Sequence, residues 1–514
     1  MIPKENGGPG NKQPPGKVTI SPSAWKTLAI LSSIATMAMY AETMLIPAIP
    51  DLIQEFNISY STSSWILSAY LVVGAVMTPI TGKLSDMYGK KKMLLVTLIF
   101  YAVGVSLGGF STSIYMLLFA RALQGVGMSI FPIAFGIVRD QFPREKLAIG
   151  QGVISSMFAA GAVIGLLAGG SIIQNFGWRV TFYSIIPVIV ALIFVIRRFV
   201  HVDERPMRYL HADETCKPKE AASTSAPSSG RMPASAMDIK GIVTLAGTIV
   251  SFLLALTFME SGGITSMQIA AFLAAGSTSL VLFILVERKA RSPLVDFRLM
   301  LHQIILPSNV MITIVGLCMF MVFQTIPVLV RSPPPSGFGG DAFQAANIQL
   351  PFALVFLVFG PTSGFIISKW GSVKPTVLGS IIMCAGFFAL VMLHSTPLMV
   401  SANLAVISTG LSLTNVGVMN INMLSTPREF MGISLGMNTL FRIVGSSIGP
   451  AVAGMFMQVN RYAVSSGGTT NFFPSAESYY LIFITAAVVS VTAAVLAFVL
   501  KSRIRTRDAQ EARI

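Results

Sequence analysis

The chain alternates long apolar runs with short polar segments, and this pattern predicts helices that cross a lipid bilayer. A helix needs about twenty predominantly apolar residues to span the hydrocarbon core. Fourteen runs approach that length: six in the first part of the chain, two in the middle and six at the end. They cover residues 27–49, 64–84, 93–111, 114–136, 150–173, 180–199, 239–260, 266–286, 304–326, 347–368, 376–394, 397–419, 430–457 and 478–500. An even number of crossings places both termini on one side of the membrane.

Polar segments divide the predicted all-α integral membrane protein into units. The segment between the sixth and seventh runs has no apolar face to bury, so we expect a solvated linker there. The expected units are a disordered cytoplasmic tail at 1–25, a six-helix bundle at 26–199, the cytoplasmic linker at 200–238, two inserted transmembrane helices at 239–287, a cytoplasmic loop at 288–303, a second six-helix bundle at 304–500 and a basic cytoplasmic tail at 501–514.

Composition and charge agree with a multi-pass membrane protein. With 53% hydrophobic and 11% charged residues in 514, the chain is too apolar for a soluble protein. The formal net charge of +15 raises the alternative of nucleic-acid binding, but the basic residues recur in loops instead of gathering on one domain. Only Arg179, Arg331 and Arg461 fall in loops on the side opposite the termini. The positive-inside rule therefore predicts a cell-membrane protein with both termini in the cytoplasm.

The segment between the second and third runs holds a recognisable motif. Asp86 lies between Gly82 and Gly89, and lysines follow from Lys90 to Lys92. An ordinary positive-inside turn explains the lysines but not the glycine and aspartate framework. The segment resembles the signature loop of the major facilitator superfamily, in which the aspartate helps to hold one transport conformation. The resemblance implies the major facilitator fold and a conformational role for Gly82, Asp86, Gly89, Lys90 and Lys92.

Glycines recur at matched spacing in the fifth run and in the next-to-last run. Such stripes let helices pack closely, and small-residue packing alone is sufficient to explain them. Recurrence at one offset, together with a degenerate copy of the loop at Gly364 and Gly371, favours two six-helix repeats. The positions are Gly152, Gly161, Gly165, Gly169 and Gly170, and then Gly436, Gly445, Gly449, Pro450 and Gly454.

The first stripe resembles the antiporter signature of the drug-exporting branches of that superfamily. In those branches a Gly-Pro pair occupies the place of Gly165 and Leu166, so the proline is missing here, whereas the second copy has Gly449 and Pro450. Fourteen helices, the loop and the stripe together resemble the fourteen-helix drug:proton antiporter family over residues 26–502.

Ionisable residues are rare inside the predicted helices, and each one costs a few kcal/mol there. Glu42 is the only acid well inside a helix, and Arg121 and Arg442 are the only central cations. Glu42 and Arg121 lie at similar depths, about 11 to 12 Å from the outer ends of their helices. The resemblance implies proton coupling at these two residues, because a contact that forms and breaks would load and release a proton. The alternative is a static ion pair that locks the helices.

A further set of polar residues is expected to line a water-filled cavity for substrate. The alternative is that they form hydrogen bonds between helices. The set is Thr43, Gln124, Gln324, Thr325, Asn403, Ser412 and Asn415.

The function that these patterns favour is proton-coupled export of hydrophobic or cationic small molecules by alternating access. Without a Gly-x4-Gly-Lys-Ser/Thr phosphate loop, ATP is not the expected energy source. The expected partners are a small-molecule substrate, protons and the lipid bilayer, without nucleic acid, metal or cofactor, and the chain is expected to act as a monomer. Three alternatives stay open: an exporter of one metabolite, a non-transporting membrane sensor, and a membrane-embedded enzyme. We expect no catalytic residue, since the four histidines lie at or beyond helix ends.

Overall fold

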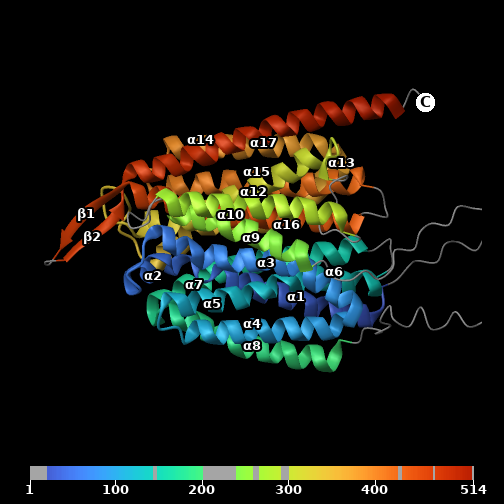
Figure 1. Cartoon of the computed structure of the whole chain (residues 1–514), viewed down its shortest axis with the longest axis horizontal. Helices are drawn as coiled ribbons and strands as arrows, with labels where there is room; N and C mark the ends of the chain where they lie inside the picture. The colour runs from blue at the N-terminus through green and yellow to red at the C-terminus, as the bar shows by residue number, and fades with distance from the viewer. Residues whose placement is uncertain are drawn as a thin grey trace, which may run out of the picture.

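The computed structural model describes residues 20–142, 147–200, 239–258, 266–290, 300–426, 431–466 and 469–511. Long helices run nearly parallel to one axis (Figure 1). One end of the bundle carries a two-stranded hairpin, and we call it the hairpin end. The opposite end, where α1 begins and α17 finishes, is the terminal end. Within the described residues the elements are α1 (Pro22–Thr43), η1 (Ile46–Ala48), α2 (Ile49–Glu55), α3 (Tyr60–Tyr88), α4 (Lys90–Gly109), α5 (Ile114–Gly125), η2 (Val126–Ser129), α6 (Ile130–Gln141), α7 (Leu147–Phe176), α8 (Trp178–Phe199), α9 (Ile239–Phe258), α10 (Ser266–Lys289), α12 (Ile305–Arg331), α13 (Ala342–Trp370), α14 (Val373–Met392), α15 (Pro397–Ser425), α16 (Met431–Val459), β1 (Arg461–Ser466), β2 (Thr469–Pro474) and α17 (Ala476–Glu511).

The described residues contain 12 helices that are long and apolar enough to cross a membrane. Two further apolar stretches, Ala160–Phe176 in α7 and Lys240–Phe252 in α9, are shorter. The all-helical membrane character expected from the sequence is confirmed, whereas the count of fourteen crossings is not. The expected N-terminal tail up to residue 19 and the linker at 201–238 lie outside the described residues, so the domain boundaries stay predictions.

Several helices are longer than the apolar runs that predicted them, because polar residues extend or cap them. Ser21, Ser59 and Ser113 each accept a hydrogen bond from a backbone N–H in the first turn of a helix. The expected turn between residues 84 and 93 is wrong in extent. Gly89 alone separates α3 from α4, at a φ of 95° that favours glycine.

Two corrections concern the end of the chain. The expected all-α class misses the antiparallel hairpin of β1 and β2, which projects beyond the helices in Figure 1. Its sequence signal was the pair Gly467-Gly468 between two runs containing Val, Tyr, Thr and Phe. The expected basic tail from residue 501 is helical up to Glu511, since α17 continues past the apolar run.

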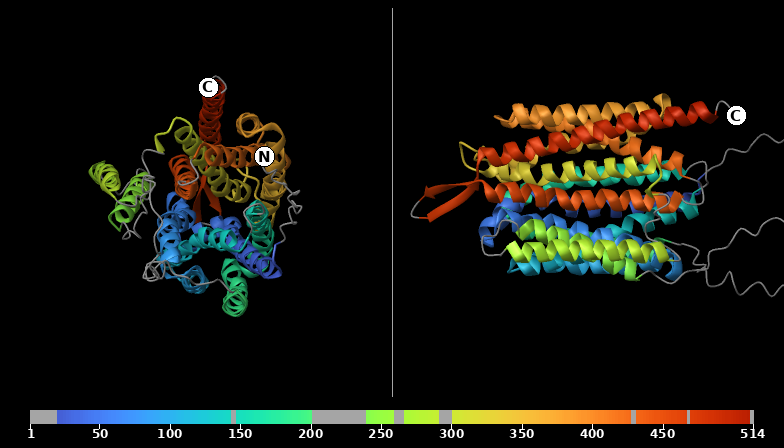
Figure 2. Two further views of the ribbon diagram at one scale, coloured as in Figure 1. Left: turned by 90° about the vertical axis from the view of Figure 1, so that its right-hand side faces the viewer. Right: turned by 45° about the horizontal axis from the view of Figure 1, so that its top comes forward.

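The helices pack through two long seams. α3 lies along α16 and α7 lies along α13, and within the flanking groups α1 packs on α7 and α12 packs on α16. α10 packs chiefly on α9, and α9 contacts both α3 and α16. In the end-on view of Figure 2 the yellow-green pair α9 and α10 lies at the edge of the bundle. The central site is therefore built by helices other than α10.

Candidate functional site

Arg121 on α5 is fully buried and is held by three different helices. Its Nε donates to the backbone oxygen of Ile66 at 2.9 Å, and its Nη1 donates to Gln124 Oε1 at 2.9 Å and to the backbone oxygen of Ala41 at 3.4 Å. The guanidinium carbon lies 4.7 Å from the centre of the Tyr70 ring, a cation–π contact. These contacts fix the guanidinium beside α1, at the backbone of Ala41, the residue before Glu42.

Glu42 on α1 is 3% exposed, and its Oε2 has no hydrogen-bond partner among the described residues. Of the ion pairs within 4.0 Å among the described residues, none joins Glu42 to Arg121. The structure therefore brings the two residues close to each other without a salt bridge. Arg121 and Arg442 on α16 both act electrostatically on Glu42. The acid is thus within electrostatic range of one cation of its own half of the chain and of one of the other half.

Three more buried atoms near this acid have no partner among the residues that the structure describes: Arg121 Nη2, Tyr70 Oη and Tyr101 Oη. Tyr70 lies on α3 and Tyr101 on α4, and the charges of Glu42 and Arg121 act on both rings. Sequence reasoning missed these tyrosines, because each stands alone in an apolar run. A tyrosine whose hydroxyl is buried usually has a partner, so four unpaired atoms together point to a site.

Gln124 and Thr43 were expected to line the substrate cavity, but the structure places them in packing roles. Both amide atoms of Gln124 form bonds, since Oε1 accepts from Arg121 and Nε2 donates to the Gly104 backbone oxygen at 3.1 Å. Thr43 Oγ1 donates to a backbone oxygen of its own helix, α1, and to the backbone oxygen of Ala162 on α7 at 3.2 Å. Gln124 therefore positions Arg121, and Thr43 joins two helices.

The other expected cavity residues lie on α12 and α15. Gln324 Nε2 donates to Ser63 Oγ of α3 at 3.0 Å, while its Oε1 has no partner among the described residues. Ser412 Oγ is buried and likewise has no hydrogen-bond partner in the described part of the chain. Asn403 instead donates to the Leu393 backbone oxygen at 2.7 Å and ties α15 to the end of α14. Thr325 bonds within its own helix and Asn415 is partly exposed.

The two seams are closed at the hairpin end. Tyr60 N donates to Gln458 Oε1 at 3.2 Å and Ser68 Oγ donates to the Ser447 backbone oxygen at 2.8 Å, both between α3 and α16. On the other seam the Ala342 backbone N–H donates to Gln174 Oε1 at 3.3 Å. An ion pair between Asp51 on α2 and Arg331 on α12 adds a further bridge.

The same seams are loose toward the terminal end. A Cβ added to Gly82 on α3 or to Gly436 on α16 would meet no atom within 4 Å. The same holds for Gly360 and Gly364 on α13. The helices on the two sides of each seam are therefore joined at the hairpin end, and free space lies beside these glycines toward the terminal end.

The predicted glycine stripes pack α7 on α1 and α16 on α12. A Cβ on Gly161, Gly165 or Gly169 would collide with backbone of α1, and one on Gly445 or Gly449 would collide with backbone of α12. Gly170 instead faces Ala346 of α13, and Gly454 faces Tyr60 of α3, so these two lie in the seams. Gly152 lies in the first turns of α7, and Pro450 lies inside α16.

The residues of the predicted conformational loop lie at the terminal end. Asp86 lies in the last turn of α3, and Lys92 is exposed in the first turn of α4. Lys90 forms an ion pair with Asp140 of α6 and donates to the Gly136 backbone oxygen at 3.2 Å. The lysine therefore joins α4 to α6.

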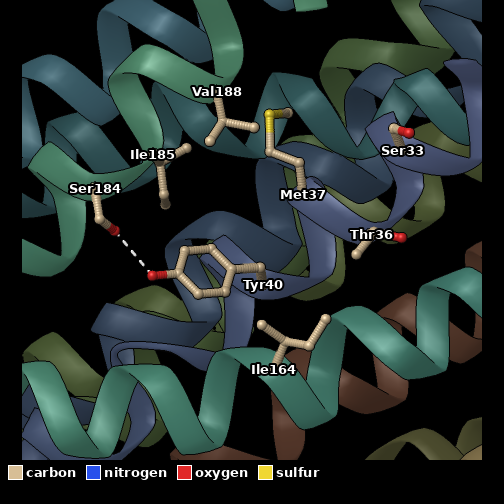
Figure 3. Close-up of a pocket in the computed structure, with 8 residues that line it drawn as sticks. All are labelled: Ser33, Thr36, Met37, Tyr40, Ile164, Ser184, Ile185 and Val188. Atoms are coloured by element: carbon tan, nitrogen blue, oxygen red, sulfur yellow. Dashed lines mark hydrogen bonds between the residues drawn. The ribbon is translucent and has the colours of Figure 1, made fainter.

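A separate groove of about 380 Å³ opens between α1, α7 and α8 (Figure 3). Its Tyr40 and Ser184 hydroxyls bond to each other at 2.8 Å, while Ile164 and Val188 on its rim are about half exposed. Paired hydroxyls behind an apolar rim suit a surface against acyl chains. The groove is distinct from the cluster around Glu42.

The sequence profile of the Major Facilitator Superfamily matches residues 31–450 and 352–513. This chain belongs to the major facilitator superfamily. The superfamily is one of membrane transporters. The superfamily's fold is also seen in the human organic anion transporter MFSD10, with a TM-score of 0.61 at 14% identity over 93% of this chain and 100% of that one.

Among relatives in the superfamily, the tetracenomycin C resistance and export protein of Streptomyces glaucescens is 27% identical over 441 residues, 84% of this chain and 76% of that protein. Multidrug resistance protein 3 of Bacillus subtilis is 28% identical over 439 residues, 83% of this chain and 78% of that protein. An uncharacterized MFS-type transporter of Mycobacterium tuberculosis is 26% identical over 426 residues, 81% of this chain. The match spans 57% of that longer mycobacterial protein.

Proposed function

We propose that this chain is a fourteen-crossing secondary active transporter that exports hydrophobic or cationic small molecules, such as drugs, in exchange for protons. The observation that carries the proposal is the cluster of unpaired buried atoms on Glu42, Tyr70, Tyr101 and Arg121. Buried polar groups normally have partners, and an ionisable group inside a membrane is costly unless it has work to do. The names of the Streptomyces and Bacillus relatives, an antibiotic export protein and a multidrug resistance protein, support export.

The fourteen crossings follow from the lengths of α7 and α9. α7 has 30 residues and α9 has 20, which at about 1.5 Å per residue is enough to span the hydrocarbon core. We further propose that the terminal end lies on the cytoplasmic side of the cell membrane, because described basic residues such as Lys90, Arg197 and Lys369 lie at that end of their helices. Asp86 and Lys90 at this end then belong to the part that closes when the hairpin end opens.

We infer proton coupling from the position of Glu42 within electrostatic range of Arg121 and Arg442. A nearby guanidinium favours the ionised carboxylate, whereas loss of water favours the neutral acid. When the halves move, the distance from Glu42 to Arg442 changes, because Glu42 and Arg121 belong to one half and Arg442 to the other. With the hairpin end open Glu42 takes up a proton from outside. With the terminal end open it releases the proton inward, and substrate enters from the cytoplasm.

The test is Glu42→Gln, which keeps the shape and removes the charge. We expect purified Glu42→Gln protein in liposomes to lose uphill transport of ethidium driven by a pH gradient, while exchange of ethidium for ethidium persists. Glu477→Gln is the matched control, because Glu477 is exposed in the first turn of α17 and should leave transport unchanged.

Other roles for Glu42 give other results. A counter-ion for cationic substrate predicts that Glu42→Gln loses ethidium and spares uphill transport of neutral chloramphenicol. A static pair predicts that Glu42→Gln destabilises the protein and that Glu42→Gln with Arg121→Gln restores both fold and transport. Uphill transport of chloramphenicol by Glu42→Gln at the wild-type rate would reject the proton-carrier role.

A further inference from the structure

A chain of aromatic rings runs between α12 and α13, away from the charged cluster. The ring centres of Phe320 and Phe323 are 5.4 Å apart, and those of Phe323 and Phe352 are also 5.4 Å apart. Phe352 and Phe356 follow at 6.3 Å with ring planes only 9° apart. The first three rings are buried and Phe356 is partly exposed, so the chain of rings leads from the interior toward the looser terminal end.

Unpaired polar atoms accompany these rings. Gln349 on α13 is fully buried, and neither of its amide atoms has a hydrogen-bond partner among the described residues. The other two are Gln324 Oε1 on α12 and Ser412 Oγ on α15, already described. Leaving a buried amide without partners costs about 1–3 kcal/mol per group, so such groups are retained where something else binds them.

Helix geometry places Gln349 and Ser412 beside the rings. Gln349 lies three residues before Phe352, and positions three apart share a helix face. That face meets α12, because Phe352 contacts Phe323. Gln324 follows Phe323 but points about 100° round the helix, where it donates to Ser63 of α3. On α15, Ser408 Oγ donates to the Phe352 backbone oxygen at 2.6 Å. Four residues, about one turn, further along each helix lie Ser412 on α15 and Phe356 on α13, so these two residues are level with each other.

The chemistry of this surface is neutral. The rings, the Gln349 amide and the Ser412 hydroxyl supply stacking faces, hydrogen-bond donors and acceptors, and none of these side chains is charged. An aromatic ring system stacks on phenylalanine, and a ring hydroxyl both donates and accepts, which satisfies an amide oxygen and an amide nitrogen together. A purely aliphatic ligand would leave the amide unpaired.

We propose that Gln349 and Ser412, together with the rings of Phe352 and Phe356, form a substrate subsite for uncharged aromatic ring systems that carry a hydroxyl group. The proposal rests on the transport function proposed above and assigns substrate recognition to the second half of the chain and proton handling to Glu42 in the first half. The purely structural alternative is that these polar groups only join helices or hold water, with no ligand.

The test compares 1-hydroxypyrene and 1-methylpyrene, two probes that differ only in carrying a hydroxyl or a methyl group at the same position. Binding to the purified full-length protein in lipid nanodiscs is measured by fluorescence titration, with the signal of empty nanodiscs of the same lipids subtracted. We expect saturable binding of 1-hydroxypyrene by the wild type. Gln349→Met should weaken that binding about tenfold, the effect of one or two lost neutral hydrogen bonds. Its binding of 1-methylpyrene should stay within about twofold.

Three further variants complete the design. Phe352→Leu should weaken both probes about tenfold, because it removes a stacking face. Gln344→Leu, an exposed glutamine on the same helix, is the control and should change neither probe. Ser412→Ala is a smaller change that keeps the test valid if thermal unfolding shows Gln349→Met to be misfolded. It should weaken 1-hydroxypyrene alone.

The outcomes separate this inference from the transport function. The subsite is wrong if the wild type shows no saturable binding of 1-hydroxypyrene, if Gln349→Met binds both probes as the wild type does, or if it loses both equally. If Gln349→Met loses the phenol while Glu42→Gln still transports uphill, the subsite stands and proton coupling at Glu42 fails. If Glu42→Gln loses uphill transport while Gln349→Met binds normally, coupling stands and the subsite fails.

Discussion

Replacing Gly165 with alanine is expected to push α7 away from α1. A Cβ at this position would lie 2.7 Å from the backbone oxygen of Tyr40 and closer still to Thr43 Oγ1. An ordinary contact begins at 3.4 Å, so the helices would have to separate by about 0.7 Å to clear Tyr40, and Thr43 would also have to rotate. Rotation of Thr43 would break its 3.2 Å hydrogen bond to the backbone oxygen of Ala162 on α7.

The size of the effect follows from three contributions. Overpacking a close contact costs about 1–3 kcal/mol. Losing the Thr43 bond costs about 1 kcal/mol, and alanine regains about 1 kcal/mol of helix propensity relative to glycine. The net expectation is that Gly165→Ala lowers the free energy of unfolding by about 1–3 kcal/mol.

The assay is unfolding of purified protein in mild detergent, followed by tryptophan fluorescence as temperature rises. Gly436→Ala is the matched control, because the same methyl group on α16 would meet nothing within 4 Å. It should unfold at the wild-type temperature or slightly above, while Gly165→Ala unfolds below it. Equal unfolding temperatures for the two variants would refute the close packing of α7 on α1.

Two further predictions concern the seams. Asp51→Asn removes the partly exposed ion pair with Arg331. Because such pairs contribute at most about 1 kcal/mol, the population with an open hairpin end should rise by up to about fivefold. Spin-label distances across that end measure the shift, and an unchanged distance distribution would contradict it. Gly436→Leu should fold normally, because the space beside Gly436 is free here, yet slow transport by obstructing closure of the terminal end; transport in liposomes at the wild-type rate would show that α3 and α16 do not close there.

The hydropathy pattern predicted most helices because burial in lipid is a local property of twenty consecutive residues. It did not predict their ends: α3 continues to Tyr88 because no residue before Gly89 interrupts it. Depth along the helices correctly suggested that Glu42 and Arg121 come close. It did not show that Arg121 bonds to Ile66 and Gln124 instead of to the acid, since rotation about a helix axis depends on tertiary packing.

Gln349 illustrates the opposite case. It belongs to no motif and lies outside the repeated loop and glycine stripes, so the sequence pattern did not single it out. A glutamine at the start of an apolar run was nonetheless a usable signal, because an amide in a membrane helix needs a partner. Only the packing of α13 against α12 and α15 shows that, among the residues described, it has none.

The contacts of α9 with α3 and α16 have a consequence for the order of synthesis. The ribosome completes α9 and α10 before α12, and α16 emerges much later. Nearly two hundred further residues are therefore synthesised after α9 before α16, one of the helices on which it packs, is made. During that interval α9 can pack along α10 and against α3, which is made earlier. The pair can enter the membrane as a helical hairpin and dock sideways once α16 has joined α3.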